Sequence, residues 1–377
     1  MKAVPFKGDG VLGVVEEIRE RIDGGFRPTL AIVFASIAVG LEDLHGALRE
    51  FEFEFAGCST CGEILDCGEG GVVSSYGVVG LLLDLPRDAF TIGMVPSGEW
   101  GDRETGKDIA HWGQAQFAQP GYIVLGSGLE RNGDELVAGI SAATGGAVHA
   151  PVFGGLAGDD SDFLSTFVFD RVMLEEHGAL VLAMDTGKVS MEGVAIGGWV
   201  GIGASKQVTR ARGNVVHAIG GQPALDVYLD YLDIREDDMP RFGVDYPLLV
   251  KSGQSTVLRA VMGVNKEERS LSFAGTVPEG AMVQFSVCPG SEVVESTVES
   301  VRLFHEGCGD ADVLLLFSCM ARHLSLGPEV EDEIHRARAF WGVPLAGFFT
   351  YGEIGPDGGG RCAFHNETFT LLALREK

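Results

Sequence analysis

Apolar and polar positions alternate along the chain in a pattern that recurs three times. Short runs rich in β-branched and aromatic residues occupy 31–36, 122–126 and 313–318, which is typical of strands buried on both faces. A stretch with apolar residues at helical spacing precedes each run, at about 11–22, 105–118 and 292–305. Further helix-like stretches follow the second and third runs, at 133–144 and 330–341. Each unit is therefore predicted to read helix, strand, helix, strand, glycine turn.

The glycine turn of the first unit recurs in the third. Residues 56–64 read AGCSTCGEI and residues 346–354 read AGFFTYGEI, while 152–160 has the layout without the exact motif. The constant glycines, threonine and glutamate are interpreted as architecture that holds the turn. The exchange of Cys58 and Cys61 for Phe348 and Tyr351 predicts two related pockets with different walls.

The segments between the units favour further strands. Residues 72–84 and 90–95 are expected to form a hairpin, and 163–169, 178–184 and 189–196 an antiparallel meander. Pro223 is expected to open a helix, so the boundary between two domains is placed near 221, giving 1–220 and 221–377. Strands are expected at 257–264, 270–276 and 282–288. The predicted fold class is mixed α/β (α+β), with repeated units and additional antiparallel strands.

Composition narrows the functional classes. The 377 residues carry 28 basic and 54 acidic side chains, and a formal charge of -26 opposes binding to nucleic acid or to anionic membranes. The sequence has no run of eighteen uncharged apolar residues and no apolar signal core, so we expect a cytoplasmic protein without membrane insertion. Seven cysteines, an odd number, fit a reducing compartment.

The signature segments resemble those of the FIST proteins, bacterial sensory modules in which a FIST N domain precedes a FIST C domain. The segments are AGCSTCGE at 56–63, VFGGLAGD at 152–159, LFSCMAR at 316–322, LAGFFTYGEIG at 345–355 and FHNET at 364–368. The resemblance implies signal transduction by binding a small polar metabolite, with amino acids among the candidates. It also implies a signalling partner such as a histidine kinase or a receptor, because no output domain is recognisable in this chain. Some members of the family are heme-binding nitric oxide sensors, which is the alternative function.

Arg322 and the third glycine turn form the first candidate ligand site. Arg322 is expected in a loop at the carboxyl end of a buried strand, where its guanidinium suits a ligand carboxylate. Glu353 would meet an ammonium group and Tyr351 would stack or donate a hydrogen bond. The alternative is that Glu353 pairs with Arg322 internally. The full set of candidate ligand-binding residues is Arg322, Cys319, Phe348, Thr350, Tyr351, Glu353, His365, Asn366, Cys58, Thr60 and Glu63.

Metal binding and catalysis have weaker signals. Cys58, Cys61 and Cys67 lie close together in sequence, with His45 the nearest fourth ligand, but the second copy of the turn replaces two of the thiols by aromatic rings. A reactive dithiol or small buried thiols are the other interpretations of these cysteines. We expect no metal and no cofactor, although His365, and more weakly His217, leave non-covalent heme open.

Cys319, Arg322 and His365 could in principle supply a nucleophile and a base. A cysteine-dependent or metal-dependent enzyme is the more distant alternative, and the expectation is a protein that is not an enzyme.

Overall fold

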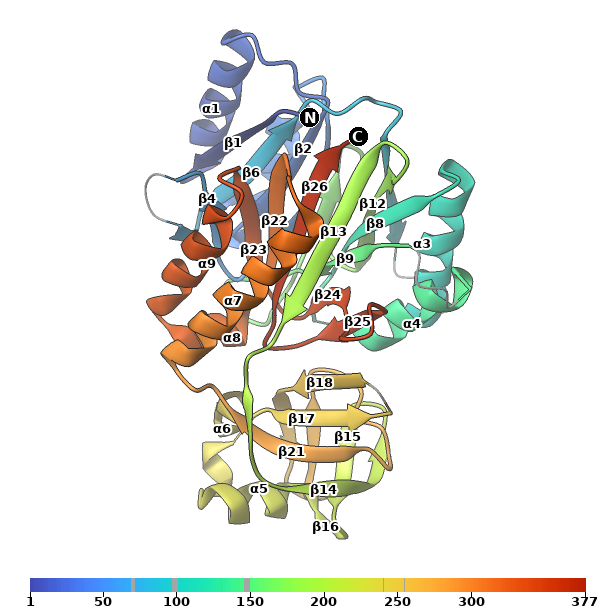
Figure 1. The fold of residues 1–377 in the computed structure, drawn as a ribbon, viewed down its shortest axis with the longest axis vertical. Coiled ribbons are helices and arrows are strands. Elements are labelled where there is room, and N and C mark those ends of the chain that lie inside the picture. Colours follow the sequence, from blue (N-terminus) through green and yellow to red (C-terminus); the bar gives the residue numbers. More distant parts are fainter. Residues whose placement is uncertain (69–71, 97–100, 130, 146–149, 240, 254) are drawn as a thin grey trace.

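A computed structural model describes residues 1–377 except 69–71, 97–100, 130, 146–149, 240 and 254. Three helix-covered β-sheets form a body from residues 1–199 and 288–377, and a smaller β-sheet unit from residues 200–287, the β-insert, lies below it in Figure 1. The chain has helices and strands in mixed order, so the predicted α+β fold class is confirmed.

The three predicted units are present in the body. Each contains two parallel strands joined through a helix, and a third strand that pairs antiparallel with the first of them. The first unit comprises α1 (Val11–Asp23), β2 (Leu30–Ala35), α2 (Leu41–Leu48), β3 (Glu54–Ser59) and β6 (Val78–Leu83). The second comprises α3 (Asp102–Gln116), β8 (Pro120–Gly126), α4 (Gly133–Ala143), β9 (Val152–Leu156) and β12 (Gly178–Asp185). The third comprises α7 (Ser291–Cys308), β22 (Val313–Cys319), α8 (Met320–Leu326), α9 (Glu329–Ala339), β23 (Leu345–Thr350) and β26 (Phe369–Glu376).

The units exchange strands in a cycle. The strand after each glycine turn joins another unit's sheet: β4 (Glu63–Asp66) pairs with β23, β24 (Glu353–Pro356) with β9, and β10 (Val168–Asp170) with β3. At the opposite edges, β1 (Ala3–Gly8) pairs with β6, β7 (Phe90–Pro96) with β12, and β13 (Val189–Ile196) with β26. Short strands β5 (Val73–Ser74), β11 (Leu174–Glu175) and β25 (Cys362–His365) complete the three sheets. The segments 1–220 and 221–377 therefore contribute strands to the same sheets, and the boundary near 221 stays a prediction.

One apolar core lies between the inner faces of the three sheets. Phe34 of β2 stacks on Phe348 of β23 with ring centroids 4.9 Å apart, and Phe317 of β22 meets Phe348 edge-on. Leu125 of β8 and Leu182 of β12 bring the second unit into the same core. Because strand side chains alternate between faces, the other residues of these strands pack against the outer helices. The three units thus depend on one another for burial.

The β-insert has its own core around Tyr228 and Phe285. Its sheet runs in the order β18 (Ser255–Arg259), β17 (Leu248–Ser252), β21 (Met282–Val287), β14 (Val200–Arg212), β15 (Val215–Ile219), β20 (Ser270–Phe273) and β19 (Val261–Asn265), with β16 (Gln222–Pro223) beside β15. Helices α5 (Ala224–Leu232) and α6 (Arg241–Asp245) cover it, and short 3-10 turns occupy Glu236–Asp238 here and Ile37–Val39 in the body. The helix predicted after Pro223 is confirmed.

Two expected strand pairings are wrong. The segments 72–84 and 90–95 do not form a hairpin, because β6 lies in the first sheet and β7 in the second. The segments 163–169, 178–184 and 189–196 are not a meander, because β10, β12 and β13 lie in three different sheets. Cyclic strand exchange overrides the pairing of neighbours along the chain that a hairpin assumes.

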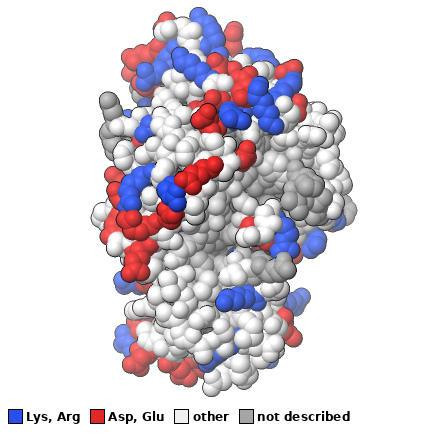
Figure 2. All heavy atoms as spheres, in the orientation of Figure 1, with Lys and Arg blue, Asp and Glu red and all other residues white. Residues whose placement is uncertain are grey.

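Charged side chains are unevenly distributed on the face shown in Figure 2. They gather at the end that carries α1 and over the helices of the third unit, whereas much of the face between is uncharged. Arg336 of α9 pairs with Glu295 of α7 at 2.7 Å, and Arg302 of α7 with Glu299 at 2.7 Å. Within the described residues, no helix is long and apolar enough to cross a bilayer.

Candidate functional site

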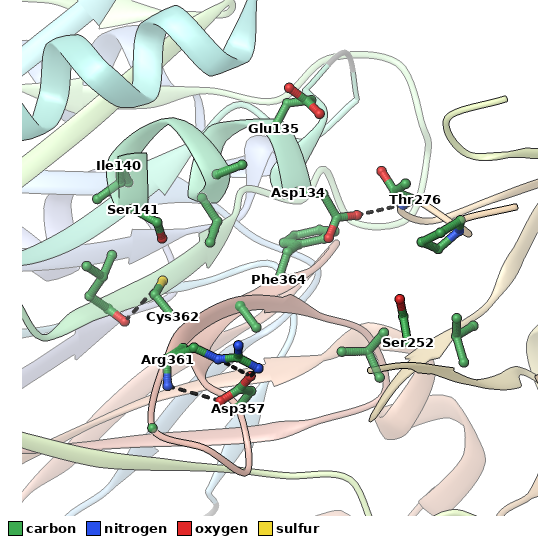
Figure 3. Close-up of a pocket in the computed structure, with 18 of the residues that line it drawn as sticks. Asp134, Glu135, Ile140, Ser141, Ser252, Thr276, Asp357, Arg361, Cys362 and Phe364 are labelled. Carbon is green, nitrogen blue, oxygen red and sulfur yellow. Dashed lines mark hydrogen bonds and ion pairs between the residues drawn. The ribbon is translucent and has the colours of Figure 1, made fainter. Parts of the chain in front are cut away.

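A cavity of about 500 Å³ lies where the second unit, the third unit and the β-insert meet. Helix α4 supplies one wall, the segment 357–364 that includes β25 supplies another, and β17, β18 and residues 276–278 of the β-insert supply the third (Figure 3). We call it the junction cavity. Its apolar lining includes Val137, Ile140, Val152, Val250, Val257 and Phe364.

An ion pair with a buried arginine lies at one end of the junction cavity. Arg259 of β18 has 2% of its side chain exposed and donates to Asp134 of α4, which is 24% exposed, at 2.7 Å. The second carboxylate oxygen of Asp134 accepts the backbone N–H of Thr276 at 2.6 Å, as Figure 3 shows. Burial lowers the pKa of Arg259, and the charge of Asp134 opposes that shift. The Asp134 carboxylate, in the first turn of α4, therefore ties the body to two segments of the β-insert: the end of β18 and the loop after β20.

Phe364 forms the floor between these segments. Its ring lies 5.8 Å from the guanidinium carbon of Arg259, within the range of a cation–π contact. A Cβ atom at Gly133 or at Gly352 would overlap the ring, so both glycines are needed for its close approach. The phenyl ring is consequently held by both the second and the third unit.

Charges of both signs stand at the mouth of the junction cavity. Arg361, with 55% of its side chain exposed, pairs with Asp357 at 3.0 Å. Glu135 pairs with Arg103 at 3.1 Å, and both side chains are about half exposed, at 43% and 53%. The Glu135–Arg103 pair is exposed enough to be weak and to exchange partners. Asp357 is only 5% exposed and holds Arg361 by several hydrogen bonds, but the exposed part of the Arg361 side chain can still be reached by a charged ligand.

The duplicated turns have the same internal hydrogen bonds. Thr60 donates to Glu63 at 2.6 Å, and Thr350 donates to Glu353 at 2.5 Å. Glu63 also accepts from the backbone of Gly77, and Glu353 from the backbone N–H and hydroxyl of Thr368. Burial raises the pKa of Glu63 and of Glu353 to about 7. These four turn residues hold the exchanged strands β4 and β24, as the constant part of the motif predicted.

Arg322 is inside the protein and not in a loop, because α8 begins directly after β22. Its side chain is 0% exposed and pairs with Glu333 of α9 at 2.5 Å. Its remaining N–H groups donate hydrogen bonds to the backbone carbonyls of Gly197 and Glu367 and to the hydroxyl of Thr297. All five N–H donors are therefore engaged by protein groups, and the internal partner is Glu333, where the alternative interpretation had Glu353.

The other predicted site residues divide between core, turn and a second cavity. Phe348, Cys58 and Cys319 are buried in strands, and burial raises the pKa of both thiols well above the ordinary value. Tyr351 donates to Asp159 and lines a second, smaller cavity near the junction cavity. The structure thus does not bring Arg322, Glu353 and Tyr351 to one of these two cavities.

His365 is the last residue of β25, and Asn366 begins the turn that leads to β26. They are 6% and 2% exposed, and burial lowers the pKa of His365 to about 4. Glu367, the next residue, is fully buried with φ 59°, and burial raises the pKa of its carboxyl group well above the ordinary range. These side chains belong to the interior of the third unit and line neither of the two cavities.

The donor groups around the cavities do not fit metal or heme binding. No cluster of three or more His, Cys, Asp or Glu side chains suited to a metal ion occurs among the described residues. No described histidine lines the junction cavity or the second cavity. Cys362 lines the junction cavity, but burial raises the pKa of its thiol to about 12, which disfavours the thiolate that would ligate iron. His45 hydrogen-bonds the backbone of Asp170, and His217 lies 3.6 Å from Glu268.

Comparison with known proteins places the chain in a family. A model of the FIST N domain matches residues 29–222, and a model of the FIST C domain matches residues 224–356. The chain belongs to the FIST family. FIST domains are associated with sensing in signal transduction. The FIST C segment contains most of the β-insert and the glycine turn of the third unit.

Relatives share part of this sequence. An uncharacterized protein of Mycobacterium bovis is 30% identical over 183 residues, which cover 45% of this chain and 47% of that protein. An uncharacterized protein of Mycobacterium tuberculosis is 29% identical over 181 residues, with the same coverage of 45% and 47%. The matches thus span about half the length of these curated relatives.

Sequence reasoning missed the residues that form the junction cavity. Asp134, Arg259 and Phe364 lie far apart in the sequence and in no shared motif, although Phe364 opens the FHNET signature. One signal was available for Arg259, because an arginine at the end of a strand with apolar residues on both sides needs a buried counter-ion.

Proposed function

We propose that this FIST protein is a small-molecule sensor whose ligand, a metabolite of the amino-acid class, binds in the junction cavity. The single observation that carries the proposal is that this cavity is lined at once by α4, by residues 357–364 and by the β-insert. A ligand bound there contacts three parts of the fold that are separate in sequence.

The size and lining of the junction cavity support a small amphipathic ligand. Its volume of about 500 Å³ lies within the range of ordinary small-molecule sites. The apolar wall formed by Val137, Ile140 and Val257 suits an aliphatic or aromatic side chain. Arg361 offers a guanidinium to a carboxylate, and Glu135 offers a carboxylate to an ammonium group. Charges of both signs beside an apolar wall favour a zwitterion over an anion or a hydrocarbon.

Ligand binding would act on the orientation of the β-insert relative to the body. A ligand shifts a conformational equilibrium only by its different affinity for the two states. Contacts to Ser252 and Val257 on one side and to Ser141 on the other exist together only when the β-insert is docked. The ligand therefore stabilises the docked arrangement, and a signalling partner such as a histidine kinase or a receptor would recognise that arrangement.

A thermal-shift screen against the twenty amino acids tests the proposal. Ser141→Phe places a ring in the junction cavity, whereas Ala142→Phe places the same ring on the exposed neighbouring position of α4. A ligand at 100 times its Kd stabilises the folded state by about 2.7 kcal/mol. We expect at least one amino acid to raise the melting temperature of the native protein and of Ala142→Phe, but not of Ser141→Phe. Equal stabilisation of both variants would place the ligand elsewhere.

A further inference from the structure

A second cavity of about 340 Å³ lies beside the junction cavity, at the carboxyl ends of the parallel strands β8 and β9. Its walls come from residues 128, 129 and 131–133 between β8 and the start of α4, from Phe163 in the loop after β9, from Tyr351 and Phe364, and from residues 214, 262 and 273–275 of the β-insert. Carboxyl ends of parallel strands are a common place for ligands in sheets of this kind. We call it the aromatic cavity.

Four aromatic rings line the aromatic cavity: Phe163, Phe273, Tyr351 and Phe364. Phe163 stacks on Tyr351 with ring centroids 4.9 Å apart and planes 13° from parallel. The hydroxyl of Tyr351 donates to Asp159, which fixes the orientation of that ring. The cavity therefore presents ring faces on which a planar molecule can stack.

The loop that carries Phe163 holds an unfavourable conformation. Asp160, Ser161 and Phe163 have φ of 55°, 71° and 56°, in the left-handed region that side chains other than glycine rarely adopt. Asp159 stabilises this loop by accepting the backbone N–H groups of Phe163 and Leu164. The result is a phenylalanine that is 46% exposed, although burial of its ring elsewhere would be favourable. Strained residues that display an apolar side chain are a recurrent property of ligand sites.

Large apolar side chains are concentrated at the rim. Leu129, Phe163 and Met262 all line the cavity and are 38%, 46% and 47% exposed. Leu164, next in the chain to Phe163, is 76% exposed. Scattered exposed apolar residues need no explanation, but several around one cavity indicate a surface that is covered when a ligand binds.

The polar groups of the aromatic cavity favour an uncharged ligand with a hydrogen-bond acceptor. Gly133 begins α4; the N–H groups of Glu135 and Leu136 donate to Asn132, which leaves those of Gly133 and Asp134 without an acceptor inside the helix. The charge of Arg131 is compensated by Asp102 at 2.8 Å. The chain as a whole carries -26 charges, which opposes phosphorylated ligands.

We propose that the aromatic cavity is a second binding site, for an uncharged planar heteroaromatic molecule such as a free nucleobase. The ligand ring stacks on the exposed face of Phe163, whose other face is covered by Tyr351, and an acceptor atom of the ring meets the N–H groups of Gly133 and Asp134 at the start of α4. This proposal does not depend on an amino acid binding in the junction cavity, because the two cavities have different linings and share only Phe364.

Titration with adenine, followed by saturation-transfer NMR and calorimetry, tests the second site. We expect saturable binding to the native full chain. Phe163→Ala should weaken adenine binding by about tenfold or more, because stacking on one ring typically contributes that much. Leu12→Ala is the matched control, because Leu12 is an apolar side chain of α1 that is 80% exposed. It should leave the affinity unchanged.

Two further variants make the outcome decisive. Tyr351→Phe retains the ring and should keep most of the affinity for adenine. The circular dichroism spectrum and the melting temperature of each variant show whether it is folded, so that a loss of binding caused by misfolding is recognised. Ser141→Phe, which fills the junction cavity, should not change adenine binding. The proposal is overturned if adenine does not bind the native protein at millimolar concentration, if Phe163→Ala binds it as well as the native protein, or if Ser141→Phe abolishes binding.

Discussion

The contact between Asp134 and Arg259 is the most informative one to break, because it joins the body to the β-insert at the junction cavity. Asp134→Ala removes the carboxylate and leaves a guanidinium that is 2% exposed without its counter-ion. It also removes the acceptor of the Thr276 N–H group. The variant creates two unsatisfied donors at one interface without changing the apolar packing directly.

The expected loss follows from these two contacts. A hydrogen bond to a charged group contributes about 1.5–3 kcal/mol, and an unsatisfied buried donor costs about 1–3 kcal/mol. Removing one partner of a buried ion pair typically destabilises by about 3–5 kcal/mol. Asp134 is 24% exposed and Arg259 keeps its hydrogen bonds to the carbonyls of Thr276, Leu258 and Phe364, so we expect Asp134→Ala to lower the free energy of unfolding by less than this, about 2–4 kcal/mol. Asp134→Asn, which keeps an acceptor for Thr276, should lose less.

Glu135→Ala is the matched control. Glu135 is the next residue of the same helix and pairs with Arg103 in a bridge whose side chains are 43% and 53% exposed. Such a pair contributes about 0–1 kcal/mol. Urea unfolding followed by circular dichroism and by tryptophan fluorescence measures each variant. If Asp134→Ala and Glu135→Ala differ by less than about 1 kcal/mol, the Asp134–Arg259 pair does not hold the β-insert on the body.

The remaining predictions concern the interior of the body. Because burial raises the pKa of Glu353 from its ordinary value of 4.5 to about 7, the folded state binds more protons than the unfolded state, and stability should fall between about pH 4.5 and 7 by up to about 3 kcal/mol. Glu353→Gln should remove that part of the pH dependence and stabilise the protein at pH 8. Urea unfolding at pH 5 and at pH 8 measures this, and a difference in the free energy of unfolding between the two pH values that is the same in Glu353→Gln as in the native protein would refute the assignment. Arg322→Met should destabilise the protein by about 3–5 kcal/mol, since it leaves Glu333 buried without its partner. The double variant Arg322→Met/Glu333→Leu should recover much of that loss, and a double variant no more stable than the single one would contradict this.

Local patterns predicted the units of the fold well. The helices at 11–22 and 292–305 and the strands at 31–36 and 313–318 follow from side-chain periodicity, and α1, α7, β2 and β22 confirm them. The role of Thr350 and Glu353 in the turn followed from the duplication itself. These features depend on residues that are close together in the sequence.

Pairings between distant segments could not be predicted in the same way. Nothing in the sequence of β7 distinguishes a partner in β6 from one in β12, because both are short apolar strands. Arg322 was expected in a loop, since a strand followed by MAR gives no sign that a buried glutamate eleven residues later will pair with it. The junction cavity depends on three such long-range arrangements at once, which is why its residues were missed.

Hydrogen–deuterium exchange with and without the amino acid found in the screen tests the central claim most directly. A ligand in the junction cavity should slow exchange together in α4, in residues 357–364 and in strands β17 and β18, which are distant from both in the chain and meet them only in the folded structure. Ser141→Phe should abolish this protection, and Ala142→Phe should retain it. Protection confined to β22 and α8 around Arg322, with no change in the β-insert, would contradict the account.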